Sequence, residues 1–371
     1  MTQIIKALNE LASINTHWQN TNGIKKTLKL ILGDFKKIAD HASIQSLPPI
    51  IQTNLDGTTT KTPSWALIAQ KRSTASFKIL LSIHIDTVYP EKSPFQTCIK
   101  KGDLLHGPGV CDAKGGLIIL MQGLKRFEKK HKKNIGWTVI INADEEIGSP
   151  KSSSLLIEHA KHHNIGLVFE PTLPNKKLVS QRKGSSNITL ISHGIAAHAG
   201  RHFFKGSNAI IQLTELLREW NQDFSNNDNR IINIGQIQGG EATNQVPDLA
   251  IAKINIRTTT KKMMDKILQD IKTRIHSNPY IELEYNSYRP PKKLDPSTQQ
   301  LLKTLKTLNP KLSWESSGGV CDGNTLSNAG LPTLDTMGPI GNHIHTHNEY
   351  VEISSIKEKT QLFYEFLNAA N

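Results

Sequence analysis

The chain has 371 residues, of which 37% are hydrophobic and 21% charged, and its formal net charge is +13. This composition excludes a disordered chain and is typical of a globular protein large enough for two domains. The longest apolar run, residues 117–121, is far shorter than the roughly 20 residues that cross a bilayer, so we expect no membrane partner.

The cysteines and the N-terminus bear on the cellular compartment. Cys98, Cys111 and Cys321 form an odd, sparse set without paired spacing, so a disulfide framework is not expected. The first ten residues lack the apolar stretch of a secretory signal. We therefore expect free thiols in a reducing cytoplasm.

The positive charge raises the question of nucleic acid. The densest basic run, residues 129–133, follows a helical pattern and precedes a strand pattern, which is typical of a solvated helix end. Its neighbourhood has no aromatic interleaving and no nucleic-acid-binding motif. The charge therefore favours anionic small substrates, and we expect no nucleic-acid partner.

Short, apolar, β-branched runs in the first half predict buried strands at residues 78–83, 137–143 and 166–169. Residues 116–130, between the first two, carry apolar side chains at helical spacing. A strand, a helix and a strand in succession predict a largely parallel or mixed sheet flanked by helices. Such sheets bind their ligands outside the carboxyl ends of the strands.

The pattern changes in the middle of the chain. Strands are predicted at residues 187–192, 230–237, 249–257 and 280–285, with helices at 207–222 and 261–275. The order β-α-β-β-α-β is that of a ferredoxin-like α+β domain.

Alternation of helix and strand then resumes, with helices at residues 298–308 and 353–367 and a strand at 331–336. The simplest interpretation is an α/β catalytic domain, residues 1–184 and 288–371, interrupted by an inserted domain, residues 185–287. Residues 288–291 would be the linker that returns to the catalytic domain.

Five short phrases carry the chemistry, and their acids and histidines follow apolar runs. They are residues 83–87, 109–116, 144–148, 169–172 and 345–350. Imidazole nitrogen and carboxylate oxygen suit divalent zinc, and manganese or cobalt would also fit. Two cations held close together need an anionic bridge, which one aspartate supplies through its two oxygens. The set predicts two metal ions in one cleft.

Spacing within two of the phrases suggests separate roles. Glu145 and Glu146 are adjacent at a predicted strand end and should project in opposite directions, so that one binds metal while the other moves protons. His84 and Asp86 are two apart and should share a face, so that Asp86 can accept the spare imidazole N–H and fix its tautomer.

From about residue 80 to 355, these phrases resemble, in order, a family of co-catalytic zinc peptidases and deacylases. This family includes glutamate carboxypeptidase, acetylornithine deacetylase, succinyl-diaminopimelate desuccinylase and aminoacylase. The resemblance implies a cis peptide after Asp112, with Asp112 bridging two metals and Glu145 as general base. The metal ligands that it implies are His84, Asp112, Glu146, Glu170 and His345.

The resemblance extends to the inserted domain and to one later loop. It implies that His198 reaches a partner subunit's active site, where it stabilises the oxyanion. It also implies substrate contacts by Asn244 and by Arg257, whose planar fork of donors suits a free carboxylate. Gly318 and Gly319 match a glycine turn that lines the pocket, although Val320 and Cys321 depart from the small or polar residues expected after it.

Each assignment has an alternative. Asp112 could be a helix N-cap and Glu170 could simply end a strand. His343 or His347 would replace His345 if the register shifts. Other candidates for partner histidine are His193 and His202, Arg257 could form a surface salt bridge, and Asn244 could serve only the backbone of a glycine-rich turn.

We expect a dinuclear zinc hydrolase that cleaves an amide next to a free carboxylate, most like the glutamate carboxypeptidase branch. Its substrate would be a small peptide or N-acyl amino acid that bears a carboxylate. The inserted domain is expected to mediate a homodimer and to close over the substrate. The main alternative is an N-acyl amino acid deacylase. A more distant alternative is a basic, non-catalytic binding protein on the same scaffold.

Overall fold

The computed structural model describes residues 2–130, 134–224, 226–276 and 278–370. It divides into two compact units. Unit 1 comprises Met1–Pro49, Thr62–Arg182 and Lys292–Asn371, and unit 2 comprises Ile50–Lys61 and Lys183–Pro291. Of the basic run at residues 129–133, Lys129 and Lys130 form the last turn of a helix, and residues 131–133 lie outside the described ranges.

Unit 1 is built on a mixed six-stranded sheet with the strand order β1-β2-β6-β3-β7-β16. Strands β6, β3, β7 and β16 run parallel to one another, whereas β2 is antiparallel to β6. The bounds are β1 His41–Thr53, β2 Thr59–Lys71, β3 Phe77–His84, β6 Ile135–Asn142, β7 Ile165–Val168 and β16 Thr333–Leu334. The prediction of a largely parallel or mixed sheet is confirmed.

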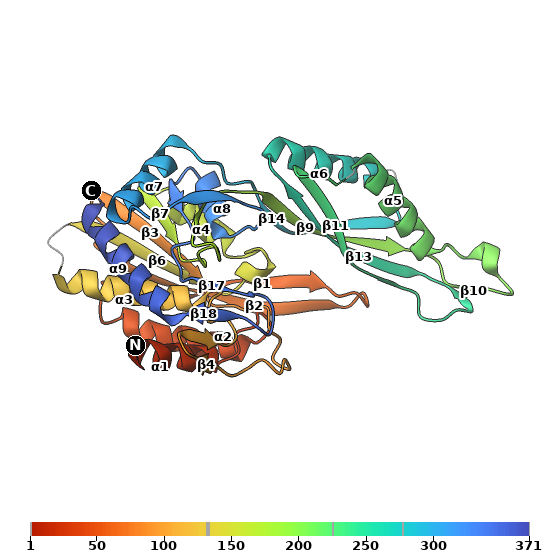
Figure 1. Cartoon of the computed structure of the whole chain (residues 1–371). Helices are drawn as coiled ribbons and strands as arrows, with labels where there is room; N and C mark the ends of the chain where they lie inside the picture. The colour runs from red at the N-terminus through yellow and green to blue at the C-terminus, as the bar shows by residue number, and fades with distance from the viewer. Residues whose placement is uncertain (1, 131–133, 225, 277, 371) are drawn as a thin grey trace. The chain divides into compact units, whose positions relative to one another are not determined.

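Helices cover both faces of this sheet because its inner strands are apolar on both sides. Along β3, Ile79 and Leu81 belong to one hydrophobic cluster, and Leu80 between them belongs to another. The first cluster includes α1 (Thr2–Ala12), α2 (Thr21–Phe35), α3 (Lys114–Lys130), α7 (Pro296–Leu308) and α9 (Ile353–Ala369). The second includes α4 (Ser153–Ala160) and α8 (Asp322–Asn328). Helices α3 and α9 pack side by side (Figure 1).

The register of the inner strands brings their carboxyl ends to one edge. His84, the last residue of β3, pairs with Asn142, the last residue of β6. On the other side, Val168 at the end of β7 pairs with Ser82. Residues that follow these three strands therefore start from neighbouring positions at the same edge.

Two smaller sheets position the later loops. One has the order β17-β18-β5-β4, and the other pairs β15 with β8. The loop that contains His345 connects β17 (Gly341–Asn342) to β18 (Tyr350–Glu352), and Gly318–Gly319 follows β15. The remaining bounds are β4 Ile99–Lys101, β5 Leu104–His106, β8 Leu178–Arg182 and β15 Trp314–Ser317.

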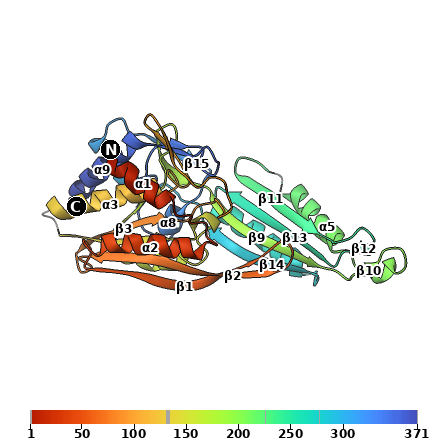
Figure 2. The same cartoon turned by 90° about the horizontal axis from the view of Figure 1, so that it is seen from below.

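Unit 2 has an antiparallel sheet of order β11-β13-β9-β14, whose strands lie side by side in Figure 2. Helices α5 and α6 cover one face through a separate hydrophobic cluster. The chain order is β9 (Gly184–His193), α5 (Ala209–Asp223), β11 (Arg230–Gly239), β13 (Leu249–Thr258), α6 (Lys261–His276) and β14 (Ile281–Arg289). This is the β-α-β-β-α-β order. Residues 288 and 289 extend β14, so the prediction that they belong to a linker is wrong.

Unit 2 also contains the tip of the hairpin formed by β1 and β2, residues 50–61. The Thr53 hydroxyl donates to Glu284 Oε1 of β14 at 2.6 Å. At Gly57, where φ is +84°, an added Cβ would lie 2.7 Å from the Leu249 side chain. The hairpin tip is thus packed closely against the sheet of unit 2.

None of the helices in the described part of the chain combines the length and the apolar character that crossing a bilayer requires.

Candidate metal centre

The acidic and histidine residues that follow the inner strands of unit 1 meet in one cluster. His84 ends β3, Glu145 and Glu146 lie just after β6, and Glu170 lies two residues after β7. Donor atoms of His84, Asp112 and Glu146 lie within 4.8 Å of one another, and so do donor atoms of His84, Glu145 and Glu170. The parallel strands bring together residues that are up to 86 positions apart in the sequence.

Asp112 lies between two histidines at the centre of this cluster. Its Oδ1 is 3.0 Å from His84 Nε2, and its Oδ2 is 3.3 Å from His345 Nε2. His84 Nε2 is also 3.6 Å from Glu170 Oε1, and His345 Nε2 is 3.2 Å from Glu146 Oε2. The carboxylate of Asp112 therefore has one histidine and one glutamate on each side.

Asp112 is in a loop and does not cap a helix. Helix α3 begins at Lys114, and a cis peptide bond joins Asp112 to Ala113, as the resemblance implies.

His84 is almost completely buried, and its two ring nitrogens have different surroundings. Nε2 faces Asp112, whereas Nδ1 lies 3.1 Å from the Asp86 carbonyl oxygen and 3.4 Å from Asp86 Oδ1. A proton on Nδ1 leaves the lone pair of Nε2 free to bind a cation. The second oxygen of Asp86 accepts the Glu146 backbone N–H at 2.9 Å, so Asp86 contacts both the end of β3 and the segment that follows β6.

Glu145 and Glu146 lie in a single 3₁₀ turn, η1 (Glu145–Ile147), rather than at the end of a strand. The alternation of a strand is therefore not the reason that their side chains diverge. The carboxylate of Glu146 faces His345, while Glu145 belongs to the group with His84 and Glu170. Both acids thus lie in the cluster with His84, and Glu146 also contacts His345.

The electrostatics of the cluster call for cationic compensation. Burial, followed by the charge of Asp112, raises the pKa of Glu146 to about 8. Burial likewise raises the pKa of Glu170 well above its usual range. Hydrogen bonds with Asp112 and Glu146 raise the pKa of His345 to about 11. Burial opposes charge on His84, yet Glu170 and Asp112 raise its pKa well above its usual value. Divalent cations would supply the positive charge that this cluster favours.

The donor set fits such cations. Glu170 Oε1 is buried and has no hydrogen-bond partner among the described residues. Buried carboxylate oxygens are normally hydrogen-bonded or bound to metal. Imidazole and carboxylate donors without a thiolate suit zinc, and also manganese or cobalt.

The loop between β17 and β18 presents His345 to the cluster. His345 has a φ of +63°, and His343 has a φ of +55°. The neighbouring histidines contact other residues: the ring of His347 stacks on Phe95, and that of His343 lies next to Tyr350. Of the three alternating histidines, His345 is the one that contacts Asp112.

A buried group of charges near the glycine turn was not predicted from the sequence. Arg182 binds both oxygens of Asp335, at 3.0 and 3.1 Å, and Lys292 Nζ lies 2.8 Å from Asp335 Oδ2. Arg182 also donates to the Gly319 carbonyl oxygen at 3.2 Å. Two cations share one carboxylate here. An arginine at the end of an apolar strand, as in residues 178–182, is the only sequence signal for it.

Three further predicted residues, His198, Asn244 and Arg257, lie in unit 2. Within unit 2, His198 of β10 (Ala197–His198) pairs with Gln245 of β12 (Gln245–Val246), and the Ala199 N–H donates to the Asn244 carbonyl oxygen. Nδ1 of the exposed His198 accepts the Gly200 N–H at 3.1 Å, so the neutral ring carries its proton on Nε2. Arg257 Nε donates to Asn255 Oδ1 at 3.0 Å.

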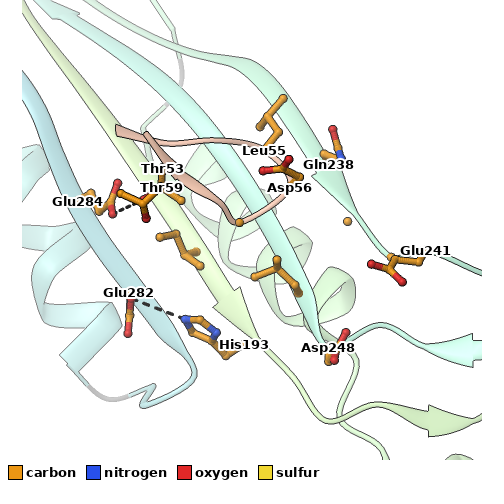
Figure 3. Close-up of a pocket in the computed structure, with 15 residues that line it drawn as sticks. Thr53, Leu55, Asp56, Thr59, His193, Gln238, Glu241, Asp248, Glu282 and Glu284 are labelled. Atoms are coloured by element: carbon orange, nitrogen blue, oxygen red, sulfur yellow. Dashed lines mark hydrogen bonds and ion pairs between the residues drawn. The ribbon is translucent and has the colours of Figure 1, made fainter. Parts of the chain in front are cut away.

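Unit 2 has a pocket of its own, about 620 Å³ in volume, between the hairpin tip and the sheet. Figure 3 shows acidic side chains around it, and Glu282 pairs with His193 across 3.6 Å. None of the residues predicted for the metal centre or for substrate binding lines it. His193, the alternative candidate for partner histidine, therefore lines this pocket beside Glu282.

Comparisons with known proteins agree on one family. The family model for peptidase family M20/M25/M40 matches residues 80–369. The chain is 27% identical to carboxypeptidase G2 of Pseudomonas sp. (strain RS-16), covering 96% of this chain and 86% of that enzyme. It is 29% identical to succinyl-diaminopimelate desuccinylase of Hahella chejuensis, covering 75% and 76%. An M20 family metallo-carboxypeptidase structure from Sulfolobus solfataricus shares the fold, with a TM-score of 0.77, 15% identity and coverage of 99% of both chains.

Proposed function

Because the chain belongs to peptidase family M20/M25/M40 and is thus a hydrolase of peptide or amide bonds, we propose that it uses two metal ions, zinc in the first place, to cleave an amide bond next to a free carboxylate. The observation that carries this proposal is the position of Asp112 between two histidine–glutamate pairs. A carboxylate with both oxygens directed at separate donor sets is suited to bridging two cations.

In this proposal His84 and Glu170 would hold one ion, His345 and Glu146 would hold the other, and Asp112 would be shared by both. When bound, the metals polarise the scissile carbonyl and lower the pKa of water. Asp86 orients His84 from the Nδ1 side, and also holds the Glu146 backbone. These contacts restrict the orientation of His84 and the position of Glu146.

Glu145 is the general base. Its carboxylate belongs to a group of potential donors with His84 and Glu170, so it borders the proposed centre. It takes a proton from the attacking water and delivers it to the leaving amine. His198 donates from Nε2 to the developing oxyanion, which is the tautomer that its contact with Gly200 favours.

Arg257 binds the free carboxylate of the substrate, Asn244 contacts the substrate, and Gly318 and Gly319 line its pocket. Arg257 has a fixed orientation, because Asn255 accepts from its Nε. Arg289 is close enough for its charge to lower the pKa of Arg257, after the larger effect of burial. At Gly318 an added Cβ would meet nothing within 4 Å, which fits a turn next to open space. A chain of net charge +13 also attracts anionic substrates.

Two substrate classes remain, and each has support. A carboxypeptidase G2-like activity is favoured by a match that covers 96% of the chain. An N-acyl amino acid deacylase is favoured by the 29% identity to the desuccinylase. Pocket contacts of one or two residues decide between such substrates.

We further propose a cytoplasmic homodimer that forms through unit 2. Cys98, Cys111 and Cys321 are all free thiols, which suits a reducing compartment. Within the described residues, β11 has a strand neighbour on one side only and exposes Ile234 and Ile237. An exposed apolar sheet edge of this kind offers unpaired backbone groups and apolar side chains to another chain.

The test is an assay with N-acetyl amino acids, N-succinyl amino acids and dipeptides ending in Glu, Asp or Arg, on enzyme loaded with zinc, manganese or cobalt. A chelator should abolish turnover, and added zinc should restore it. Absence of turnover of all of these substrates by metal-loaded protein would contradict the reaction class. Salt-dependent DNA binding in place of turnover would favour the non-catalytic alternative.

A further inference from the structure

Glu349 is a buried acid next to the proposed metal centre that has no role in the proposed reaction. Its side chain is 1% exposed. Oε1 accepts the backbone N–H groups of Cys111 and Asp112 at 2.9 and 3.0 Å, and Oε2 accepts the N–H of Gly109 at 2.9 Å. One carboxylate thus binds three backbone donors of the loop that carries Asp112.

This loop has a conformation that permits the contacts. Gly109 has a φ of +71°, which glycine adopts without steric strain. The Gly107 N–H donates to the Glu349 carbonyl oxygen at 3.2 Å, so backbone and side chain hold the same loop. Hydrogen bonds from backbone N–H to an ionised carboxylate are stronger than those between neutral groups.

Glu349 also lies in the loop that carries His345. Its own N–H donates to the Thr346 carbonyl oxygen at 3.1 Å. The buried Tyr89 hydroxyl lies 2.8 Å from both the Thr346 carbonyl oxygen and Glu349 Oε2, and it can donate to either. The segments around Asp112 and His345 therefore meet at a single carboxylate.

We infer that Glu349 is a positioning residue that fixes the distance between Asp112 and His345, and thereby the geometry in which the bridging carboxylate meets the second metal ion. It acts through the backbone and is not itself a ligand, since its two oxygens are occupied by N–H groups of the loop and by Tyr89. Removing its charge loosens both loops at once. The inference rests on the proposed dinuclear centre.

The test is the substitution Glu349→Gln, with Glu352→Gln as the matched control. Glu352, three residues along in β18, loses the same charge, and its own carboxylate lies 3.7 Å from Lys176. Dissociation constants for zinc are measured by competition with a chromogenic chelator, together with the visible spectrum of the cobalt form and the melting temperature of metal-free protein. Glu349→Gln should weaken binding of at least one ion by about 10- to 100-fold, as loss of an outer-sphere partner does, and alter the cobalt spectrum.

The outcomes separate the two proposals. Wild-type protein that binds no metal contradicts the proposed function itself. Wild-type protein that binds two ions, with a Glu349→Gln variant of unchanged affinity and spectrum, overturns the positioning role, even if the variant melts at a lower temperature. Should Glu349→Gln fail to fold, Tyr89→Phe removes one contact of the carboxylate and should weaken metal binding by a smaller factor. Unchanged metal binding in Tyr89→Phe would then count against the inference.

Discussion

Glu145 and Glu146 are adjacent acids of one cluster, and the proposal assigns Glu145 as the base and Glu146 as a metal ligand. Glu146 contacts His345, and it lies in the same donor group as His84 and Asp112. We expect Glu145→Gln to retain two metal ions per chain while kcat falls by about 10²- to 10⁴-fold, because the amide cannot take a proton from water. Metal content by plasma mass spectrometry and steady-state kinetics check this.

The matched variant is Glu146→Gln, which should lose bound metal together with activity. If Glu145→Gln is the variant depleted of metal, the roles of the two glutamates are exchanged.

Arg257 gives a prediction about specificity. A lysine keeps the charge at this position but cannot offer two parallel donors to a carboxylate. Arg257→Lys should reduce kcat/KM for an acid substrate by about 10- to 100-fold, the worth of a charged hydrogen bond. The C-terminal amide of the same substrate, already a poor substrate, should be unaffected. An equal loss for the acid and the amide would indicate that Arg257 serves the fold of unit 2 instead.

At the level of elements, α9 contains a buried lysine. Lys359 is 7% exposed, and its Nζ has no hydrogen-bond partner in the described part of the chain. Burial lowers its pKa from 10.5 to about 8, despite the opposing charge of Glu358. The folded state therefore disfavours the charged form. The contribution of Lys359 to the free energy of unfolding should be most favourable above pH 10.5, decrease as the pH drops toward 8, and stay constant below that.

Lys359→Met should remove this penalty. We expect the free energy of unfolding at pH 7 to rise on the order of 2 kcal/mol, and the dependence on pH between 8 and 10.5 to weaken. Urea denaturation at pH 7 and pH 10 measures both effects. Lys357→Met, at an exposed position on the same helix, is the control and should leave stability nearly unchanged. Destabilisation by Lys359→Met would mean that the ammonium is compensated.

The elements that could be predicted from sequence are those with a strong apolar pattern. β3, β6 and β7 are buried on both faces, so each is a continuous apolar run, and the amphipathic helices α5 and α6 show helical spacing. No comparable pattern predicts η1, a three-residue turn after β6. The continuation of β14 through residues 286–289 was also missed, because its polar residues pair with β9 across a bulge.

More of the candidate site than of the surrounding fold could be predicted from the sequence, because each phrase contains histidines or acids of the types that bind metal ions or move protons. His84, Asp112, Glu146, Glu170 and His345 are the residues that the structure brings together. Residues that act through the backbone left no such signal. Glu349 lies in one of the five phrases, but its three N–H contacts depend on a loop more than 230 positions away. The Arg182–Asp335–Lys292 group likewise exists only through tertiary structure.

For the whole molecule, the proposed dimer depends on the edge of unit 2. The register places Ile234 opposite Ile254 and Ile237 opposite Ala252, on the face that α5 covers, and Ile211 of α5 is also exposed. Ile234→Lys should shift the protein from dimer to monomer in sedimentation velocity, because a charge at this edge opposes strand pairing. Ile157→Lys, an equally exposed isoleucine in α4, is the control. A dimer that tolerates Ile234→Lys would place the interface elsewhere.

The proposed dimer allows His198 of one subunit to serve the metal centre of the partner subunit, and a mixing experiment tests this. If His198 serves the partner's site, a subunit with Glu145→Gln and a subunit with His198→Ala form one complete site between them. Each variant alone should be nearly inactive, and random mixing after dissociation should restore about a quarter of wild-type activity, since half of the dimers are mixed and each has one working site. If His198 serves its own chain, no mixture recovers activity, because no subunit then has both groups. Turnover measured against mixing ratio distinguishes the two arrangements.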